Sequence, residues 1–291
     1  MKKESEVTLL HMCEPGRFEW HSLCLLSSIL ALCTDDYNLV AYRSQHKIGK
    51  LRHETISFHE RHGIPLVAIN TEGPFLHRYD IGAKIVATNQ RRIGKFGVLL
   101  DADTMLVSNT SFAAVAWPRS VVAFPSIAQL LPSIEDWARI FGIVGLSVPP
   151  LRFTHSRANS YELRIPYFNA GVVIFPEPDA GHDLGASWIE VTRNVWPHIR
   201  EPAHCPLIDP IALPIAAFSA GLSIQPLDRA YNFPVEQKGK VFNQDVRLIH
   251  YPMGINMHRC SVADMLETIV REATDFHAVD ASGKVGYEGR R

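Results

Sequence analysis

Short apolar runs alternate with helical periodicity along the first hundred residues. The runs at Val7–Met12, 39–42 and Leu66–Ile69 have the length of buried strands and are bounded by turn-forming residues. Between them, residues 20–33 and 53–62 carry apolar positions at the spacing of a helix face. This order predicts repeated strand–helix units.

The alternation continues through the rest of the chain. A helix is predicted at 81–90 and a strand at 97–100, followed by strands at 121–124, 167–175, 222–226 and 246–250 and helices at 135–141, 185–196 and 208–220. Strands that are apolar almost throughout are typical of a parallel sheet covered by helices on both faces. We therefore expect an α/β fold with a mostly parallel central sheet flanked by helices.

The predicted elements fit a single domain over residues 1–274. Within it, residues 126–163 are an excursion whose second half, 151–163, has little periodicity. Long irregular excursions often serve as lids or binding loops, and we expect this segment to act as one. The polar, glycine-containing residues 275–291 are expected to form a flexible tail.

Composition narrows the class of protein. The 291 residues are 46% hydrophobic and 20% charged, with a formal net charge of −1, so no global field favours nucleic acid or an anionic membrane. The chain has five cysteines: Cys13, Cys24, Cys33, Cys205 and Cys260. Because their number is odd and none has C-x-x-C spacing, reduced thiols are favoured over a disulfide framework or a zinc site.

The expected location is cytoplasmic. The N-terminus lacks signal-peptide features, and the apolar stretch 23–32 is interrupted by serines and shorter than the roughly 20 residues that span a bilayer. Any contact with the inner face of a membrane would have to be peripheral, and the sequence shows no strongly amphipathic basic helix for such docking.

Candidate chemistry centres on Asp101-Ala102-Asp103, which follows the predicted strand 97–100. On an extended backbone both carboxylates would point the same way, with Ala102 turned towards the interior. Two carboxylates in one small space favour a hard divalent cation. About one D-x-D is expected by chance in a chain of this length, and Asp after a strand is often only a turn residue or helix cap. Its place at a strand's carboxyl end, where ligands bind in such sheets, favours function.

Several ordered motifs resemble those of a known enzyme class. The strand ending in Asp101-Ala102-Asp103, Tyr167-Phe168-Asn169-Ala170-Gly171-Val172, the Asp209-containing helix and Leu248-Ile249-His250-Tyr251 occur in the order seen in GT-A-fold glycosyltransferases, which use nucleotide-sugar donors. The chain is most similar to the retaining family 8, the glycogenin and bacterial galactosyltransferase type. The resemblance implies the Rossmann-like fold of the nucleotide-diphospho-sugar transferase superfamily.

The resemblance also implies a metal site. In family 8, both aspartates of the motif and a histidine after the last strand bind Mn²⁺ or Mg²⁺, which corresponds here to Asp101, Asp103 and His250. Independently, His250 ends an apolar strand that could lie beside strand 97–100, and oxygen ligands with one imidazole suit manganese better than zinc. A lone histidine is more often a surface or satisfied core residue.

The same likeness implies a binding site for the donor, which we expect to be a UDP-sugar. Lys84 corresponds to a basic donor-contacting residue, with an ordinary solvated lysine as the alternative. Asn169 is expected to face the sugar, or to form only a local hydrogen bond at the strand entry, and Asp209 to contact sugar hydroxyls or cap its helix. We assign the catalytic roles to Asp209 and Asn169. The donor-binding set is completed by Ala102, Ala170 and Gly171, with His11 and Met12 at the nucleotide base.

Two positions depart from the family pattern. The Gln that follows the family's Asp is Pro210 here, and the Gly after His250 is Gly254, one place late, with no Lys or Trp behind it; His258 or Arg259 could replace that phosphate contact. The expected activity is metal-dependent hexosyl transfer to an acceptor hydroxyl, with retention implied by the resemblance. The alternatives are a sugar-1-phosphate nucleotidyltransferase and a catalytically impaired nucleotide-sugar-binding protein. The acceptor, whether carbohydrate, glycoconjugate or protein, is not indicated.

Overall fold

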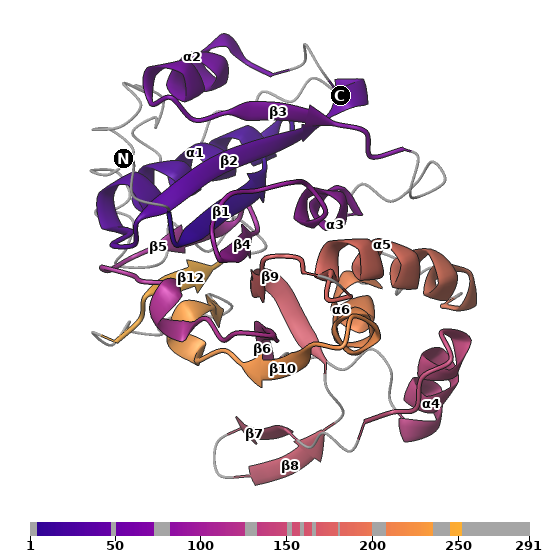
Figure 1. Ribbon diagram of the computed structural model, residues 1–291. Coiled ribbons are helices and arrows are strands. Elements are labelled where there is room, and N and C mark those ends of the chain that lie inside the picture. Colours follow the sequence, from indigo (N-terminus) through magenta and orange to yellow (C-terminus); the bar gives the residue numbers. More distant parts are fainter. Residues whose placement is uncertain are drawn as a thin grey trace.

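The computed structural model describes most of the chain as far as Tyr251 (Figure 1). The described residues are 5–47, 51–72, 82–125, 133–149, 153–157, 160–164, 167–179, 181–199, 208–234 and 245–251. The expected tail, Gly254, His258 and Arg259 lie outside them, as does part of the expected excursion at 126–163.

Helices occupy each segment where apolar residues recur at helical spacing. They are α1 (Arg17–Leu32), α2 (His53–Arg61), α3 (Ala83–Thr88), α4 (Ile134–Ile143), α5 (Leu184–Val195) and α6 (Ile208–Ser219). Helix α3 is shorter than predicted because Asn89 and Gln90 donate to carbonyls three residues back, which closes the helix in a tight turn. No helix within the described part of the chain has the length and apolarity needed to cross a membrane.

A seven-stranded sheet forms the centre of the molecule. Its spatial order is β10-β6-β9-β4-β1-β2-β3. The strands are β1 (Val7–Met12), β2 (Tyr37–Ser44), β3 (Leu66–Ile69), β4 (Phe96–Leu100), β6 (Ser120–Pro125), β9 (Phe168–Pro176) and β10 (Ser223–Pro226). The mostly parallel α/β sheet is confirmed, but β9 runs antiparallel to both β4 and β6.

Alternation along the strands divides the apolar core into two halves. Leu10 and Leu99 face helices α3 to α6, whereas Leu9 and Val98 face α1 and α2 on the opposite side of the sheet. The central strands β1 and β4 are therefore buried on both faces, which accounts for their near-continuous apolar sequence, whereas the edge strand β3 exposes Val67. Figure 1 shows α5 and α6 together beside β9, with α3 between them and the first strands.

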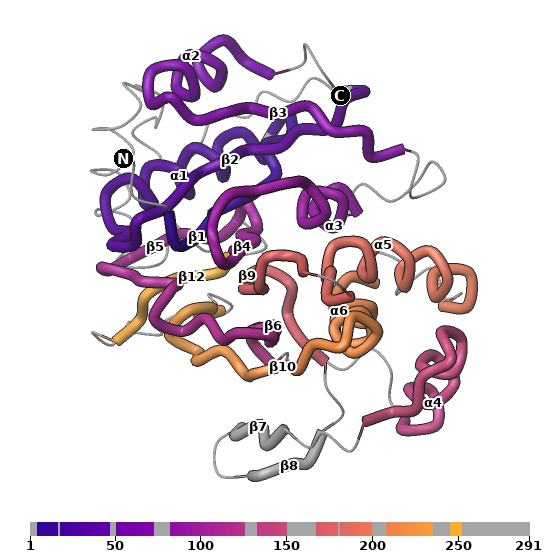
Figure 2. The backbone as a smooth tube through the Cα atoms, viewed as in Figure 1, coloured from indigo at the N-terminus to yellow at the C-terminus, as the bar shows by residue number. Residues whose placement is uncertain are grey.

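A second, three-stranded sheet lies at the carboxyl end of β4. Its strands, in the order β11-β12-β5, are β11 (Phe233–Pro234), β12 (Leu248–His250) and β5 (Thr104–Leu106). The expectation that the strand ending in His250 lies beside β4 is wrong, because β12 pairs antiparallel with β5 instead. In Figure 2, β12 lies close to β5 and β4.

The segment 151–163, which was expected to be irregular, contains a hairpin. Strands β7 (Phe153–Arg157) and β8 (Ser160–Arg164) pair antiparallel from Phe153↔Arg164 to Arg157↔Ser160. The sequence of this segment is mostly polar, and backbone pairing in a hairpin needs no apolar period. Periodicity therefore gave no strand signal here.

Candidate active site

The two aspartates of the D-x-D motif lie in a tight turn between β4 and β5. The Thr104 amide and hydroxyl both donate to the Asp101 carbonyl, at 3.0 and 2.7 Å. The premise of an extended backbone is therefore wrong, although Ala102 is buried as expected. The turn still brings Asp101 and Asp103 together, and each offers an oxygen within 4.8 Å of the other.

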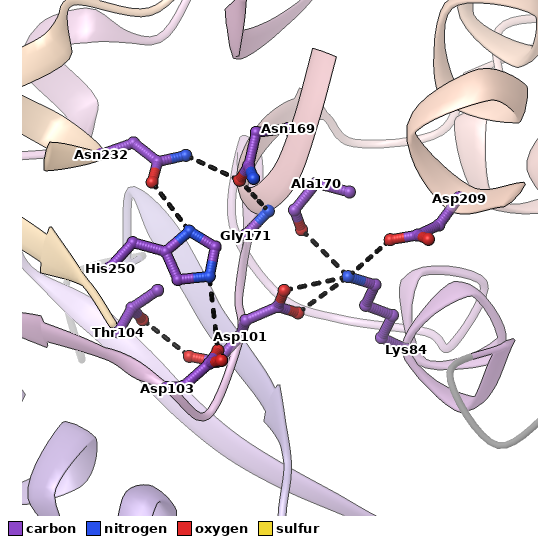
Figure 3. A network of polar contacts seen from close by, with 10 residues as sticks. All are labelled: Lys84, Asp101, Asp103, Thr104, Asn169, Ala170, Gly171, Asp209, Asn232 and His250. Carbon is purple, nitrogen blue, oxygen red and sulfur yellow. Dashed lines mark hydrogen bonds and ion pairs between the residues drawn. The ribbon is translucent and has the colours of Figure 1, made fainter. Parts of the chain in front are cut away.

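Strand pairing delivers His250 to the same turn. His250 lies opposite Thr104 in the β12–β5 ladder, and the Tyr251 amide donates to the Asp103 carbonyl at 2.9 Å. The His250 Nε2 atom is consequently 3.4 Å from Asp103 Oδ1, and Figure 3 shows the ring turned towards both carboxylates. Asp101, Asp103 and His250 form the cluster that the sequence motifs predicted for a metal, with their ligand atoms within 4.8 Å of one another.

The two carboxyl groups differ in their electrostatic surroundings. Burial raises the pKa of Asp101 above its usual value, partly opposed by the Lys84 ammonium and reinforced by the charge of Asp103. Burial acts in the same direction on Asp103, but the hydrogen bond and charge of His250 outweigh it and lower the pKa of that carboxyl. Asp103 is thus held in its ionised form, as a cation ligand must be.

Lys84 of α3 is buried against the other side of Asp101. Its Nζ lies 3.0 Å from both carboxylate oxygens of Asp101 and 2.7 Å from Oδ2 of Asp209, and it donates to the Ala170 carbonyl at 3.5 Å. Burial alone would lower the pKa of Lys84, but the two carboxylates raise it above the ordinary value. The alternative of a solvated surface lysine is therefore wrong.

Asp209 reaches Lys84 from the first turn of α6. The proline that follows it fits this position, since amide groups of a helix's first turn have no partner within the helix. Asp209 is 4% exposed, and its link to Lys84 joins α6 to the end of β4. Sequence reasoning proposed both residues for the donor site but did not predict that they contact each other.

The start of β9 lines the cluster because β9 runs antiparallel to β4. The Asp101 amide donates to the Gly171 carbonyl at 2.8 Å, which fixes the backbone at the motif. A Cβ atom at Gly171 would lie 2.5 Å from His250 Cε1 and 2.7 Å from its Nδ1, so only glycine admits the ring. The small residue predicted here for contact with a ligand is required by His250 itself.

Asn169 makes the local hydrogen bond that was the alternative interpretation, and a second one besides. Its Oδ1 accepts from the Gly171 amide at 2.8 Å and from Asn232 Nδ2 at 2.9 Å. Asn232 Oδ1 in turn lies 3.1 Å from His250 Nδ1 (Figure 3). Sequence reasoning missed Asn232, which belongs to none of the recognised motifs and reaches the site only through the pairing of β11 with β12.

His11 and Met12 lie at the end of β1, next to β4 in the sheet. The His11 side chain is 1% exposed and its Nε2 contacts the Ser22 hydroxyl at 2.7 Å. Burial, aided by nearby His59, lowers the pKa of His11 to about 3. The His11 imidazole is therefore a neutral interior group, and Met12 is half-buried against the core.

The charges and donor atoms of the cluster fit a divalent cation. Among the described residues, Asp101 and Asp209 share the ammonium of Lys84, and Asp103 lies beside Asp101 in the cluster with His250, so three carboxylates gather in a mostly buried site. Two carboxylates and one imidazole suit Mn²⁺ or Mg²⁺ better than a thiolate-seeking metal. The residues present therefore fit the implied metal.

The chain matches one known protein family over most of its length. Residues 9–221, more than half of the chain, match the model of the Rhodobacterales glycosyltransferase domain. The chain belongs to this family. The match includes Lys84, both aspartates of the turn, residues 169–171 and Asp209, and it ends before Asn232 and His250. No curated protein matches the chain in sequence.

Solved structures agree with the fold of this Rhodobacterales glycosyltransferase family member. The bifunctional glycosyltransferase WbbM superposes with a TM-score of 0.55 at 11% identity over 93% of the chain, which spans 50% of WbbM. The galactosyltransferase LgtC, solved with donor and acceptor sugar analogues, gives 0.55 at 12% identity over 94% of the chain and 98% of LgtC. The expected GT-A fold and the resemblance to family 8 are confirmed, and the chain is a glycosyltransferase.

Proposed function

We propose that this protein transfers a hexose-type sugar from a UDP-sugar donor to an acceptor hydroxyl, with Mn²⁺ or Mg²⁺ bound by Asp101, Asp103 and His250. The observation that carries the proposal is the convergence of these three ligand groups within 4.8 Å at the end of β4. The family match supports sugar transfer, and the carboxyl end of a doubly wound sheet is where such folds bind ligands.

The metal would act as a Lewis acid on the leaving nucleoside diphosphate. Asp103, ionised beside His250, and Asp101 would supply its oxygen ligands. The ammonium of Lys84 already pairs with the carboxylates of Asp101 and Asp209. It would also offset the negative charge that develops on the phosphate as the sugar–phosphate bond breaks. The acceptor oxygen would form the new bond to the anomeric carbon as the bond from that carbon to the diphosphate oxygen breaks, and the hydroxyl proton would pass to the leaving diphosphate.

Further residues complete the proposed donor site. Ala102, in the D-x-D turn, and residues 169–171 flank the cluster, so Asn169 and Asp209 are our candidates for contact with the sugar. Ala170 offers a backbone carbonyl, which Lys84 already contacts. Nucleotide-base contacts are proposed for the end of β1, made by Met12 and the backbone of His11 rather than by the buried His11 ring. Retention of configuration rests on the likeness to family 8 alone.

Pro210 favours one rival function. Its ring offers no hydrogen-bond donor where family 8 carries a Gln, so a protein that binds nucleotide-sugar without transferring it is the second candidate. The nucleotidyltransferase alternative predicts release of pyrophosphate rather than nucleoside diphosphate, and the family match does not favour it.

The direct test is incubation with a panel of nucleotide-sugars, Mn²⁺ and simple sugar acceptors, with nucleoside diphosphate release as the readout. We expect release from UDP-sugars in Mn²⁺ and its loss in the Asp103→Asn variant. Binding without release would favour the non-catalytic candidate. Full activity of Asp103→Asn would contradict the proposed role of the metal cluster.

A further inference from the structure

We propose that Asn232 is a positioning residue that fixes the tautomer and ring orientation of His250, so that His250 Nε2 faces the two carboxylates as a metal ligand. This inference rests on the metal site of the proposed function. It concerns residues that the family match does not reach, since that match ends at residue 221.

The direction of each hydrogen bond follows from one backbone group. The Gly171 amide can only donate, so the Asn169 atom 2.8 Å from it must be the side-chain oxygen. That same oxygen lies 2.9 Å from the Asn232 side chain, which must therefore present its NH₂ group. The amide orientation of Asn232 is thus set by the backbone of β9.

The orientation of the Asn232 amide determines which ring nitrogen of His250 carries a proton. With its NH₂ group turned to Asn169, Asn232 presents its oxygen to His250 Nδ1 at 3.1 Å. A carbonyl oxygen accepts only, so Nδ1 carries a proton, and Nε2, on the side of Asp103, is the ring nitrogen that faces the proposed metal site. Metal-bound histidines commonly donate their other ring N–H to such a partner, which raises affinity by fixing the ligand.

Packing holds the ring in the plane that these bonds require. His250 Cε1 and Nδ1 lie over Gly171 so closely that a Cβ atom there would overlap them. Asn232 is 2% exposed and His250 7%, so bulk water does not replace the hydrogen bonds between them. Figure 3 shows the chain of contacts running from Gly171 through Asn169 and Asn232 to His250.

The backbone around Asn232 is anchored independently of the imidazole. Asn232 follows the short helical turn Arg229–Tyr231, whose start is capped by Asp228, and precedes β11, in which Pro234 pairs with His250. The Arg247 amide also donates to the Ala230 carbonyl at 2.8 Å. The scaffold therefore presents the amide side chain to His250 before any metal is bound.

The test combines ring-nitrogen NMR with Mn²⁺ affinity in the full chain. Long-range ¹H–¹⁵N spectra, assigned for His250 with His250→Gln, are expected to show a proton on Nδ1 in the metal-free wild type. Mn²⁺ dissociation constants come from the electron paramagnetic resonance signal of free Mn²⁺. Asn232→Ala is expected to weaken Mn²⁺ binding about 10- to 100-fold. The exposed Asn109→Ala is the matched control and should leave affinity unchanged.

A second variant separates positioning from a purely structural role. Asn232→Asp keeps an oxygen for His250 Nδ1–H and should recover most of the affinity lost in Asn232→Ala, together with the Nδ1–H signature. An Nε2–H tautomer in the wild type would overturn the inference, as would equal Mn²⁺ affinity in wild type and Asn232→Ala. If Asn232→Ala fails to fold, the wild-type tautomer and the Asn232→Asp affinity decide the inference. A wild type that binds no Mn²⁺ overturns the proposed metal site and this inference with it.

Discussion

The Lys84 ammonium lies 3.0 Å from both carboxylate oxygens of Asp101, in a site where Lys84 is only 8% exposed. The same nitrogen contacts Asp209 at 2.7 Å, so one cation ties helix α3 to the end of β4 and to the start of α6. A residue placed in the donor site is therefore also part of what holds that site together.

Removal of the Lys84 ammonium should destabilise the fold. In Lys84→Met, Asp101 and Asp209 lose their buried counter-charge, and we expect a fall of about 3 kcal/mol or more in the free energy of unfolding at pH 7. Because the pKa of Lys84 is raised in the folded state, its contribution is complete at pH 7 and is lost only in strongly alkaline solution. Urea denaturation measures the change, and the exposed Lys95→Met is the control. Equal loss in both variants would contradict the role of the buried pairs.

Gly171→Ala should damage the metal cluster specifically. The added methyl group would lie 2.5 Å from His250 Cε1 and 2.8 Å from Asn169 Oδ1, so the imidazole must move. We expect Mn²⁺ affinity to fall about tenfold or more, together with about 1–3 kcal/mol of stability. Gly142→Ala in α4 is the control, because its new Cβ meets nothing within 4 Å and alanine favours a helix. Unchanged Mn²⁺ binding in Gly171→Ala would show that His250 is not a ligand.

Acid should destabilise the protein partly through His11. Its pKa is lowered to about 3 by burial, so between pH 6 and 4 the unfolded chain binds a proton at this histidine that the folded state does not. Stability due to His11 is therefore lost as pH falls, by about 1.4 kcal/mol per pH unit. His11→Gln should remove that slope from the pH dependence of unfolding, whereas the exposed His198→Gln should keep it. An unaltered slope in His11→Gln would contradict the buried neutral state.

Asp209 should matter for transfer more than for metal binding. It contacts Lys84 and is not among the three clustered ligand groups. We expect Asp209→Asn to lower the rate of transfer at least about tenfold, as loss of a group that contacts the reacting sugar would, and to leave Mn²⁺ affinity within about threefold. Steady-state release of UDP and Mn²⁺ titration provide the two readouts. An equal loss of transfer rate and of Mn²⁺ affinity would contradict this prediction and would mean that Asp209 stabilises the metal cluster.

The sequence predicted the elements better than their directions and contacts. Continuous apolar runs identified β4 and β9 as buried strands, but such runs are alike in parallel and antiparallel strands, so the reversed direction of β9 was not visible. Ordered motifs brought Asp101, Asp103 and His250 together, although for the aspartates the reason was a turn and not strand alternation.

The contacts that were missed join segments far apart in the chain. Lys84 and Asp209 meet because α3 and α6 both pack near the end of β4, and no local pattern records that pairing. Asn232 reaches His250 because β11, which follows it, pairs with β12. Strand β11 has only two residues and is too short to give a periodic signal in the sequence. Helical and strand periods encode burial, whereas these contacts depend on where elements cross.

The most direct test of the metal-dependent transferase is UDP binding measured by calorimetry with and without Mn²⁺, in wild type and Asp103→Asn. The proposed cluster predicts that Mn²⁺ tightens UDP binding to the wild type by about tenfold or more and that Asp103→Asn loses this gain, because the metal would link the protein's carboxylates to the diphosphate. Wild-type UDP affinity that is the same in Mn²⁺ and in chelator, or a full Mn²⁺ gain in Asp103→Asn, would contradict it.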